Sequence, residues 1–236
     1  MSEPGAARLV IVDDHELVRA GLRAMLSAEP DFEIVGEASD GAEALELCRE
    51  LTPDLVLMDV RMPRMDGLAA TREVKQHLSR VSVLILTVHE NQDYMLEAIR
   101  AGASGYVLKD APREQLTTAI RKVLSGESTL NRNLATQLIQ RLAFEVYERE
   151  EPSSANPPPD PERAAILESL STREREVLEL LALGHTNRKI AQTLFISVGT
   201  VKNHVEHIFA KLGVSDRTQA VVRAFEFRII TPPALQ

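Results

Sequence analysis

The sequence predicts an α/β domain built on a five-stranded, doubly wound parallel sheet, followed by a small all-α domain. The first domain is predicted because five short aliphatic runs alternate with five segments of helical periodicity over residues 9–124. Parallel strands need helical, right-handed crossovers, which place helices on both faces of the sheet. The second domain is predicted because only helical patterns follow a group of five prolines between Pro152 and Pro161.

The five predicted strands consist almost entirely of branched aliphatic residues, as expected for strands that are buried on both faces. They are LVIV at 9–12, FEIVGEA at 32–38, LVLM at 55–58, VSVLIL at 81–86 and GYVL at 105–108. The helical segments repeat apolar residues at intervals of three and four. They are Leu17–Leu26, Gly41–Leu51, Leu68–Leu78, Tyr94–Ala101 and Arg113–Leu124. In such a sheet, functional residues are expected beyond the carboxyl ends of the strands.

The C-terminal helices are predicted from residues that cap helix starts and from glycines that end helices. The predicted starts are Ser171, Asn187, Ser197 and Asp216, and the predicted stops are Gly184 and Gly213. Two short helices joined by a tight turn, the second with polar and basic residues facing outward, form a helix-turn-helix.

These patterns divide the chain into residues 1–128, 129–165 and 166–236. Within the middle segment we expect a helix over 133–150, followed by the proline-rich stretch. Because proline removes hydrogen-bond donors and restricts its neighbours, we expect an extended spacer there, with neither helix nor sheet.

Composition limits the classes of function. The chain has 236 residues with 27 Lys+Arg against 35 Asp+Glu, a net charge of −8. The lone Cys48 excludes an intrachain disulfide and a cysteine-cluster metal site. No apolar run is long enough to span a bilayer and the start does not resemble a secretory signal, so we expect a soluble cytoplasmic protein.

The negative charge argues against nucleic acid as a partner only if it is evenly spread, and it is not. The balance is −6 over residues 1–144, −4 over 145–165 and +2 over 166–228. The C-terminal piece alone is therefore slightly basic.

Five polar residues follow or close predicted strands, and they should converge on one edge of the sheet. They are Asp13, Asp14, Asp59, Thr87 and Lys109. Three carboxylates with open positions suit Mg²⁺, and a lysine with a hydroxyl suits phosphoryl oxygens. This set predicts phosphoryl transfer onto Asp59. The competing interpretation is structural, because aspartates at strand ends often cap the next helix, as Asp14 would here.

The motifs VDDH, LVLMDVRMPRMDG, LTVH and GYVLKDA resemble the receiver domain of bacterial two-component response regulators, a flavodoxin-like fold, over residues 7–126. The resemblance implies that Asp59 is the phosphoacceptor. It implies an Mg²⁺ site formed by Asp13, Asp14, Asp59 and the backbone carbonyl of Arg61. Thr87 and Lys109 would contact the phosphoryl group.

Two further residues of this domain carry expectations of their own. Tyr106 matches the switch aromatic of receivers, with a role as a core tyrosine as the alternative. Val88 replaces the smaller residue that is frequent after the threonine, so we expect it to slow phosphate access and loss.

Residues 168–228 resemble the LuxR-type helix-turn-helix of NarL/FixJ response regulators, on the motifs LSTREREVL, NxxIA and SVGTVKNHV and on the final KLGV and RTQA. The expected DNA contacts are Arg188, Lys189, Thr200, Lys202, Asn203, Glu206 and Lys211. In relatives the last helix pairs across a dimer. The corresponding candidates are Val214, Ala220, Val221, Ala224 and Phe225, with core packing as the alternative.

The sequence therefore predicts a transcription regulator, not an enzyme, that a sensor histidine kinase phosphorylates on Asp59 and that binds paired DNA half-sites as a homodimer. One alternative is a DNA binder that ignores phosphorylation and uses its receiver only for dimerisation. The other is a phosphatase of the haloacid-dehalogenase class, but VDDHEL lacks the DxDx[TV] pattern that such enzymes need.

Overall fold

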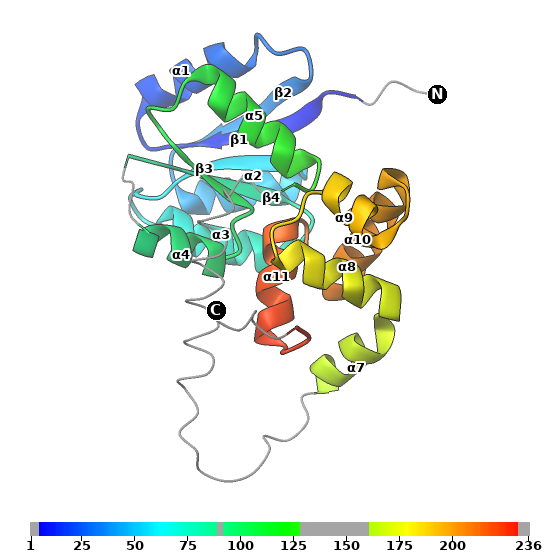
Figure 1. Cartoon of the computed structure of the whole chain (residues 1–236). Helices are drawn as coiled ribbons and strands as arrows, with labels where there is room; N and C mark the ends of the chain where they lie inside the picture. The colour runs from blue at the N-terminus through cyan, green and yellow to red at the C-terminus, as the bar shows by residue number, and fades with distance from the viewer. Residues whose placement is uncertain (1–4, 89–91, 128–160, 231–236) are drawn as a thin grey trace. The chain divides into compact units, whose positions relative to one another are not determined.

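The computed structural model describes residues 5–88, 92–127 and 161–230 of the chain (Figure 1). The chain forms two compact units, Met1–Thr129 and Leu130–Gln236, which are treated separately below. The expected helix at 133–150 and the spacer up to residue 160 lie outside the described residues. Within the described residues, no helix is long and apolar enough to cross a membrane.

The first unit contains the predicted five-stranded parallel sheet, in the order β2-β1-β3-β4-β5. The strands are β1 (Ala7–Val12), β2 (Phe32–Ala38), β3 (Leu55–Asp59), β4 (Ser82–Thr87) and β5 (Gly105–Leu108). The predicted fold class is confirmed, and each strand lies within two residues of its predicted bounds. The order of strands reverses direction between β1 and β3, so the crevice expected of a doubly wound sheet lies at the carboxyl ends of these two strands.

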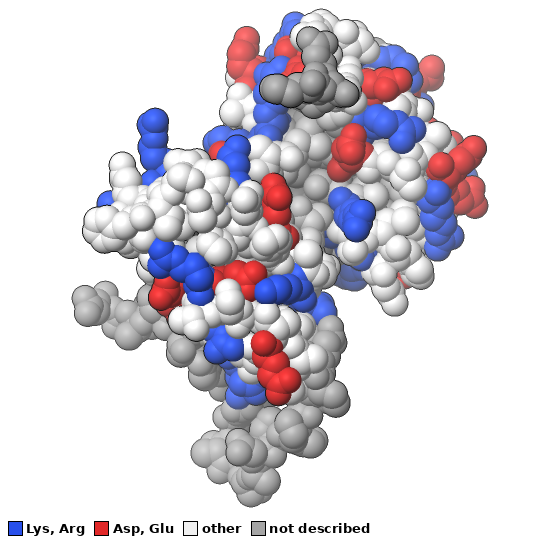
Figure 2. Space-filling model, turned by 90° about the vertical axis from the view of Figure 1, so that its right-hand side faces the viewer, with Lys and Arg blue, Asp and Glu red and all other residues white. Residues whose placement is uncertain are grey.

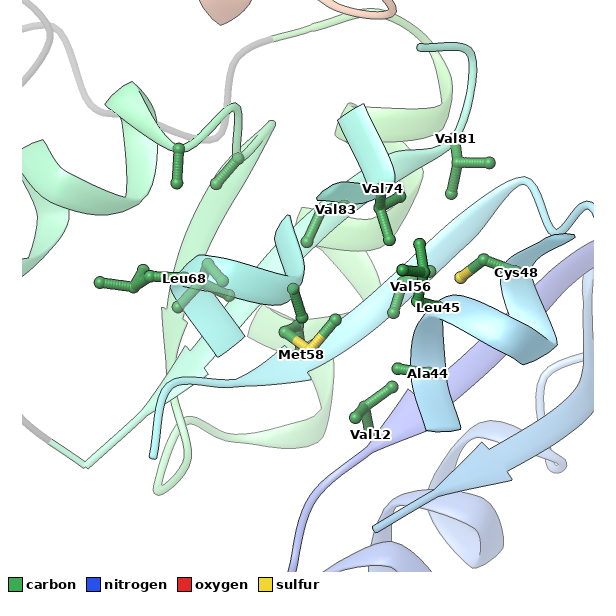
Figure 3. Packing of buried hydrophobic residues seen from close by; sticks show 14 of the residues in the cluster. Val12, Ala44, Leu45, Cys48, Val56, Met58, Leu68, Val74, Val81 and Val83 are labelled. Atoms are coloured by element: carbon green, nitrogen blue, oxygen red, sulfur yellow. The ribbon is translucent and has the colours of Figure 1, made fainter. Parts of the chain in front are cut away.

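The helices of this unit cover both faces of the sheet. They are α1 (Glu16–Leu26), α2 (Gly41–Leu51), α3 (Gly67–His77), α4 (Gln92–Arg100) and α5 (Arg113–Leu124). Successive side chains of a strand point to opposite faces of the sheet, so alternate strand residues belong to two separate apolar clusters. One cluster joins the sheet to α2, α3 and α4 (Figure 3), and the other joins it to α1 and α5.

Cys48 belongs to the first of these clusters. Its side chain is fully buried between α2 and the sheet, next to Val56 and Val74 in the same layer (Figure 3). Burial raises the pKa of the Cys48 thiol to about 11. The thiol therefore stays protonated at neutral pH and acts as a small apolar core residue.

The second unit is helical throughout its described part. Its helices are α7 (Pro161–Ser169), α8 (Thr172–Ala182), α9 (Asn187–Leu194), α10 (Val198–Leu212) and α11 (Arg217–Glu226). Ser171, Ser197 and Asp216 cap the helices that follow them, as predicted. The αL conformation of Gly213 ends α10, a backbone conformation that glycine adopts without strain.

Helix α7 corrects one expectation. It begins at Pro161, inside the segment that was expected to remain free of regular structure, and its residue Ile166 packs in the core of the helical unit. Proline is compatible with the first turn of a helix, where its missing N–H would have had no intrahelical partner. The last proline of the spacer therefore starts a helix instead of preventing one.

Candidate functional site

The predicted polar residues converge on one edge of the sheet. Asp13 directly follows β1, Asp59 closes β3 and Thr87 closes β4. Lys109 directly follows β5, and its backbone N–H donates to the carbonyl oxygen of Thr87 with an N···O distance of 2.7 Å. Because all five strands run in parallel, their carboxyl ends meet at this edge and bring together residues that are up to 96 positions apart in the sequence.

Lys109 lies between two buried carboxylates. Its Nζ is 2.6 Å from Oδ2 of Asp13 and 2.8 Å from Oδ2 of Asp59. Asp13 is 0% exposed and Asp59 is 6% exposed. A buried carboxylate without a cation is costly, so this lysine stabilises both aspartates in the resting site.

The ionisation of the pair reflects burial and mutual contact. Burial raises the pKa of Asp59, and the charge of Asp13 adds to this, while hydrogen bonds from Lys109 and the Val60 N–H act in the opposite direction. Burial disfavours the charged form of Lys109, but its hydrogen bonds to Asp13 and Asp59 raise its pKa overall. The site thus holds more negative charge than one lysine neutralises, which is what a bound divalent cation would offset.

Asp14 and His15 complete the cluster on the side nearer to solvent. Nδ1 of His15 is 2.7 Å from Oδ1 of Asp14 and 3.4 Å from Oδ1 of Asp13. Ligand atoms from Asp13, Asp14, His15 and Asp59 all lie within 4.8 Å of one another. The residue at the N-cap of α1 is His15, not Asp14, so capping does not account for Asp14.

His15 was not among the predicted site residues. Its signal in the sequence is its position directly after Asp13 and Asp14, at the junction of a strand and a helix. That signal is weak, because a histidine in a loop is ordinarily solvated.

The loop after β3 folds back close to Asp59. This close approach explains why the loop ends in Asp66 and Gly67. Asp66 caps α3 by accepting a hydrogen bond from the N–H of Ala69, and Gly67 then packs against the backbone of Asp59. A Cβ at position 67 would collide with the carbonyl oxygen of Asp59. Gly67 therefore permits the chain to fold back over the residue that closes β3.

The remaining predicted residues of this unit differ in burial. Thr87 is buried, and Tyr106 is half-buried and packs against the apolar cluster beneath α3 and α4. Val88 is 69% exposed. The guanidinium of Arg61 donates to the hydroxyl of Tyr94 on α4 at 2.9 Å and lies over its ring. Arg61 thus connects the loop after β3 with α4.

The second unit presents polar residues on α9 and α10. Arg188 and Lys189 are exposed in the first turn of α9, and Lys202, Asn203 and Glu206 are exposed on α10. Thr200 is half-buried, and its hydroxyl shares an exposed hydrogen bond of 2.8 Å with the hydroxyl of Ser197. Basic and acidic side chains are interspersed on the face of the molecule shown in Figure 2. The charge balance of residues 166–228 by themselves is +2.

Lys211, one of the expected DNA contacts, has a partner within its own unit. Its Nζ lies 2.9 Å and 2.6 Å from the two carboxylate oxygens of Glu174, which is 3% exposed. Although burial opposes ionisation, hydrogen bonds from Lys211 and Ser171 lower the pKa of Glu174 to about 2. Lys211 therefore neutralises a buried carboxylate that also belongs to the capping box of α8, and this structural role competes with the DNA contact expected of it.

The expected dimer residues on α11 pack within their own unit. Ala220, Val221, Ala224 and Phe225 are at most 6% exposed and belong to the apolar core of their own unit. Val214 is half-buried and packs against the same core. These positions agree with core packing, the alternative, while pairing of this segment with a second chain stays a prediction.

The comparisons with known proteins agree with the geometry of both units. Residues 9–121 match the family described as "Response regulator receiver domain", and residues 168–224 match "Bacterial regulatory proteins, luxR family". The chain is 41% identical to the transcriptional regulatory protein LiaR of Bacillus subtilis over 94% of this chain and 99% of that protein. It is 40% identical to the transcriptional regulatory protein DegU of Brevibacillus brevis over 93% of each.

Among solved structures, the chain is similar to a two-component response regulator of the LuxR family from Aurantimonas. The identity is 38% and the TM-score is 0.53, over 58% of this chain and 97% of that one.

Proposed function

The chain belongs to the two-component response regulators that join a receiver domain to a LuxR-type DNA-binding domain, and we propose that phosphorylation of Asp59 controls it. It is a transcription factor and not a classical enzyme. The observation that carries the proposal is the position of Lys109, whose ammonium bonds both buried aspartates, Asp13 and Asp59. A phosphoacceptor needs a cation of this kind beside it, because the transferred group brings further negative charge into a buried site.

The proposed reaction is transfer from a phosphohistidine of the cognate sensor kinase. A carboxylate oxygen of Asp59 attacks phosphorus, a P–O bond forms, and the P–N bond to the kinase histidine breaks. The histidine nitrogen keeps the electron pair of that bond, and Asp59 becomes an acyl phosphate. Lys109 then contacts a phosphoryl oxygen, and the hydroxyl of Thr87 donates to another.

Mg²⁺ fits the donors of this pocket. The carboxylates of Asp13, Asp14 and Asp59 are hard oxygen ligands, and the cluster that they form is partly open on the side of Asp14. We propose that these three residues and the backbone carbonyl of Arg61 hold the ion. When bound, it would offset charge on the transferred group.

We propose that the signal leaves the pocket through β4, β5 and α4. Thr87 and Tyr106 re-pack around the phosphoryl group, and the Arg61–Tyr94 contact transmits movement of the loop after β3 to α4. Residues 129–165, which include the start of α7, then connect the receiver with the DNA-binding unit in the cytoplasm.

For DNA binding we propose that α10 enters the major groove. Lys202 and Asn203 would read base edges, and Glu206 would accept from a cytosine amino group. Arg188, Lys189 and Thr200 would contact phosphates. Since the balance of residues 166–228 is only +2, a single copy should bind weakly, and pairing of two copies on adjacent half-sites would supply useful affinity.

Labelling with acetyl phosphate tests the proposal. In Mg²⁺, wild type should acquire a hydroxylamine-labile phosphate that Asp59→Asn does not acquire. Lack of such a label in wild type would refute the assignment. The alternative, a regulator that ignores phosphorylation, makes a different prediction: acetyl phosphate would leave the DNA affinity of wild type equal to that of Asp59→Asn.

A further inference from the structure

The structure places an imidazole at a pocket that is otherwise lined by carboxylates and one lysine. His15 is the N-cap residue of α1, yet its side chain makes no capping hydrogen bond. Instead Nδ1 faces Oδ1 of Asp14 and Oδ1 of Asp13. The imidazole is therefore directed at the cluster and not at the helix that it begins.

The two carboxylate oxygens of Asp13 face opposite sides of the pocket. Oδ2 faces the ammonium of Lys109 at 2.6 Å. Oδ1 accepts the backbone N–H of His15 at 3.0 Å and lies 3.4 Å from the imidazole Nδ1. The lysine consequently does not occupy the side on which His15 stands, and a cation there would be separated from the ammonium by the carboxylate.

The spacing of these atoms suits a small tetrahedral ion. Two ligands at about 2.1 Å from such an ion lie about 3.4 Å apart. The separation of His15 Nδ1 from Asp13 Oδ1 is 3.4 Å, while its separation from Asp14 Oδ1 is 2.7 Å and would have to widen. The side chains of His15 and Asp14 are 69% and 30% exposed, so this adjustment does not disturb the core.

We propose that His15 is a nitrogen ligand which gives the acidic pocket affinity for Zn²⁺ beyond that of its carboxylates. Imidazole favours Zn²⁺ and similar borderline cations, whereas Mg²⁺ prefers oxygen ligands and retains water. The inference rests on the pocket assigned under the proposed function. It goes further because it makes Zn²⁺ a competitor for the site in which Mg²⁺ supports phosphorylation of Asp59.

Calorimetric titration of the full chain with Zn²⁺ and, separately, with Mg²⁺ tests the inference. His15→Asn keeps a hydrogen-bonding side chain and a residue that is favourable at an N-cap, but removes the imidazole. His77→Asn is the matched control, since His77 is an exposed histidine near the end of α3 that contacts the backbone of Glu73. Zn²⁺ should bind His15→Asn at least about tenfold more weakly than wild type, and millimolar Mg²⁺ should displace it from wild type. The affinity for Mg²⁺ should be the same in all three proteins.

Three results would overturn the inference: equal affinity of His15→Asn and wild type for Zn²⁺, equal losses of Zn²⁺ and Mg²⁺ affinity in His15→Asn, or the same loss in His77→Asn. The second result would mean that His15 orients Asp14 for any cation. The proposed function is tested separately, by labelling with acetyl phosphate in Mg²⁺ without Zn²⁺. His15→Asn should still be labelled in that assay.

Discussion

Replacing Lys211 with methionine distinguishes a structural role from a DNA contact. Methionine keeps most of the apolar stem and removes the ammonium. The buried carboxylate of Glu174 then keeps its hydrogen bonds with Ser171 and, as a neighbour, the exposed imidazole of His207, whose Nδ1 lies 4.0 Å from Oε1. Removing one partner of a buried ion pair destabilises a fold because the other charge remains without compensation. We therefore expect Lys211→Met to weaken the DNA-binding unit itself.

The size of this effect follows from the pKa of Glu174, which is lowered from 4.5 to about 2. Because the folded carboxyl is the more acidic one, its interactions stabilise the unit fully above about pH 4.5, and this contribution is lost as the pH falls towards 2. The whole shift corresponds to about 3 kcal/mol. Since Lys211 is 33% exposed and Ser171 supplies part of the shift, we expect a loss of about 1–2 kcal/mol at neutral pH.

Hydrogen exchange of the amides in α8 and α10 measures this loss in the full chain. Protection should fall by about tenfold in Lys211→Met, as a loss near 1.4 kcal/mol requires. DNA affinity should keep the salt dependence of wild type, whereas Arg188→Met should reduce the slope against the logarithm of salt concentration by about one. Unchanged exchange together with a reduced slope in Lys211→Met would refute the reasoning and restore Lys211 as a phosphate contact.

Three further predictions concern the receiver. Lys109→Met should slow labelling of Asp59 by acetyl phosphate and shift it to higher pH, because the pKa of Asp59 rises further without the ammonium; an unchanged pH profile would contradict this. Gly67→Ala should lower the melting temperature seen by circular dichroism, since its Cβ collides with the backbone of Asp59, while Gly21→Ala, where a Cβ meets open space, should not. Val88→Ala should lose phosphate faster than wild type in a chase after labelling, and slower loss would reject a shielding role for Val88.

The sheet and its pocket could be predicted because both follow from local patterns combined with general rules of topology. Leu9 and Ile11 face one apolar cluster while Val10 and Val12 face the other, so a continuous aliphatic run correctly indicates a strand buried on both faces. Once the strands are parallel, the residues at their carboxyl ends share one edge of the sheet, which predicts that Asp13, Asp59 and Lys109 converge. The direct contact also depends on the strand order and on the length of the Lys109 side chain, which reaches from β5 to β3 and β1.

Some residues have partners in the structure that a local sequence pattern does not reveal. The sequence pattern predicts that Lys211 lies on a solvent-exposed helix face. The packing of α10 against α8 brings its side chain to Glu174, which lies 37 residues earlier in the sequence. Phe225 and Ala224 belong to a helix whose apolar face is satisfied within its own unit. An apolar periodicity shows that a face is covered, but it does not show whether the same chain or a second copy covers it.

The resting geometry of Lys109 limits how phosphorylation can act. Its ammonium already bonds Asp13 and Asp59, and its backbone N–H is held by the carbonyl of Thr87. When Asp59 becomes an acyl phosphate, the oxygen that Lys109 contacts is replaced by phosphoryl oxygens that lie farther from the end of β3. On the proposed function, the ammonium would have to follow them or lose its partner, and the anchored backbone would share this movement with β4 and β5. Tyr106, three residues before Lys109 on β5, and Thr87 on β4 would then be the first side chains to change their packing. We therefore propose that the fixed backbone between these strands, more than any change in net charge, would let the pocket report its chemical state at a distance.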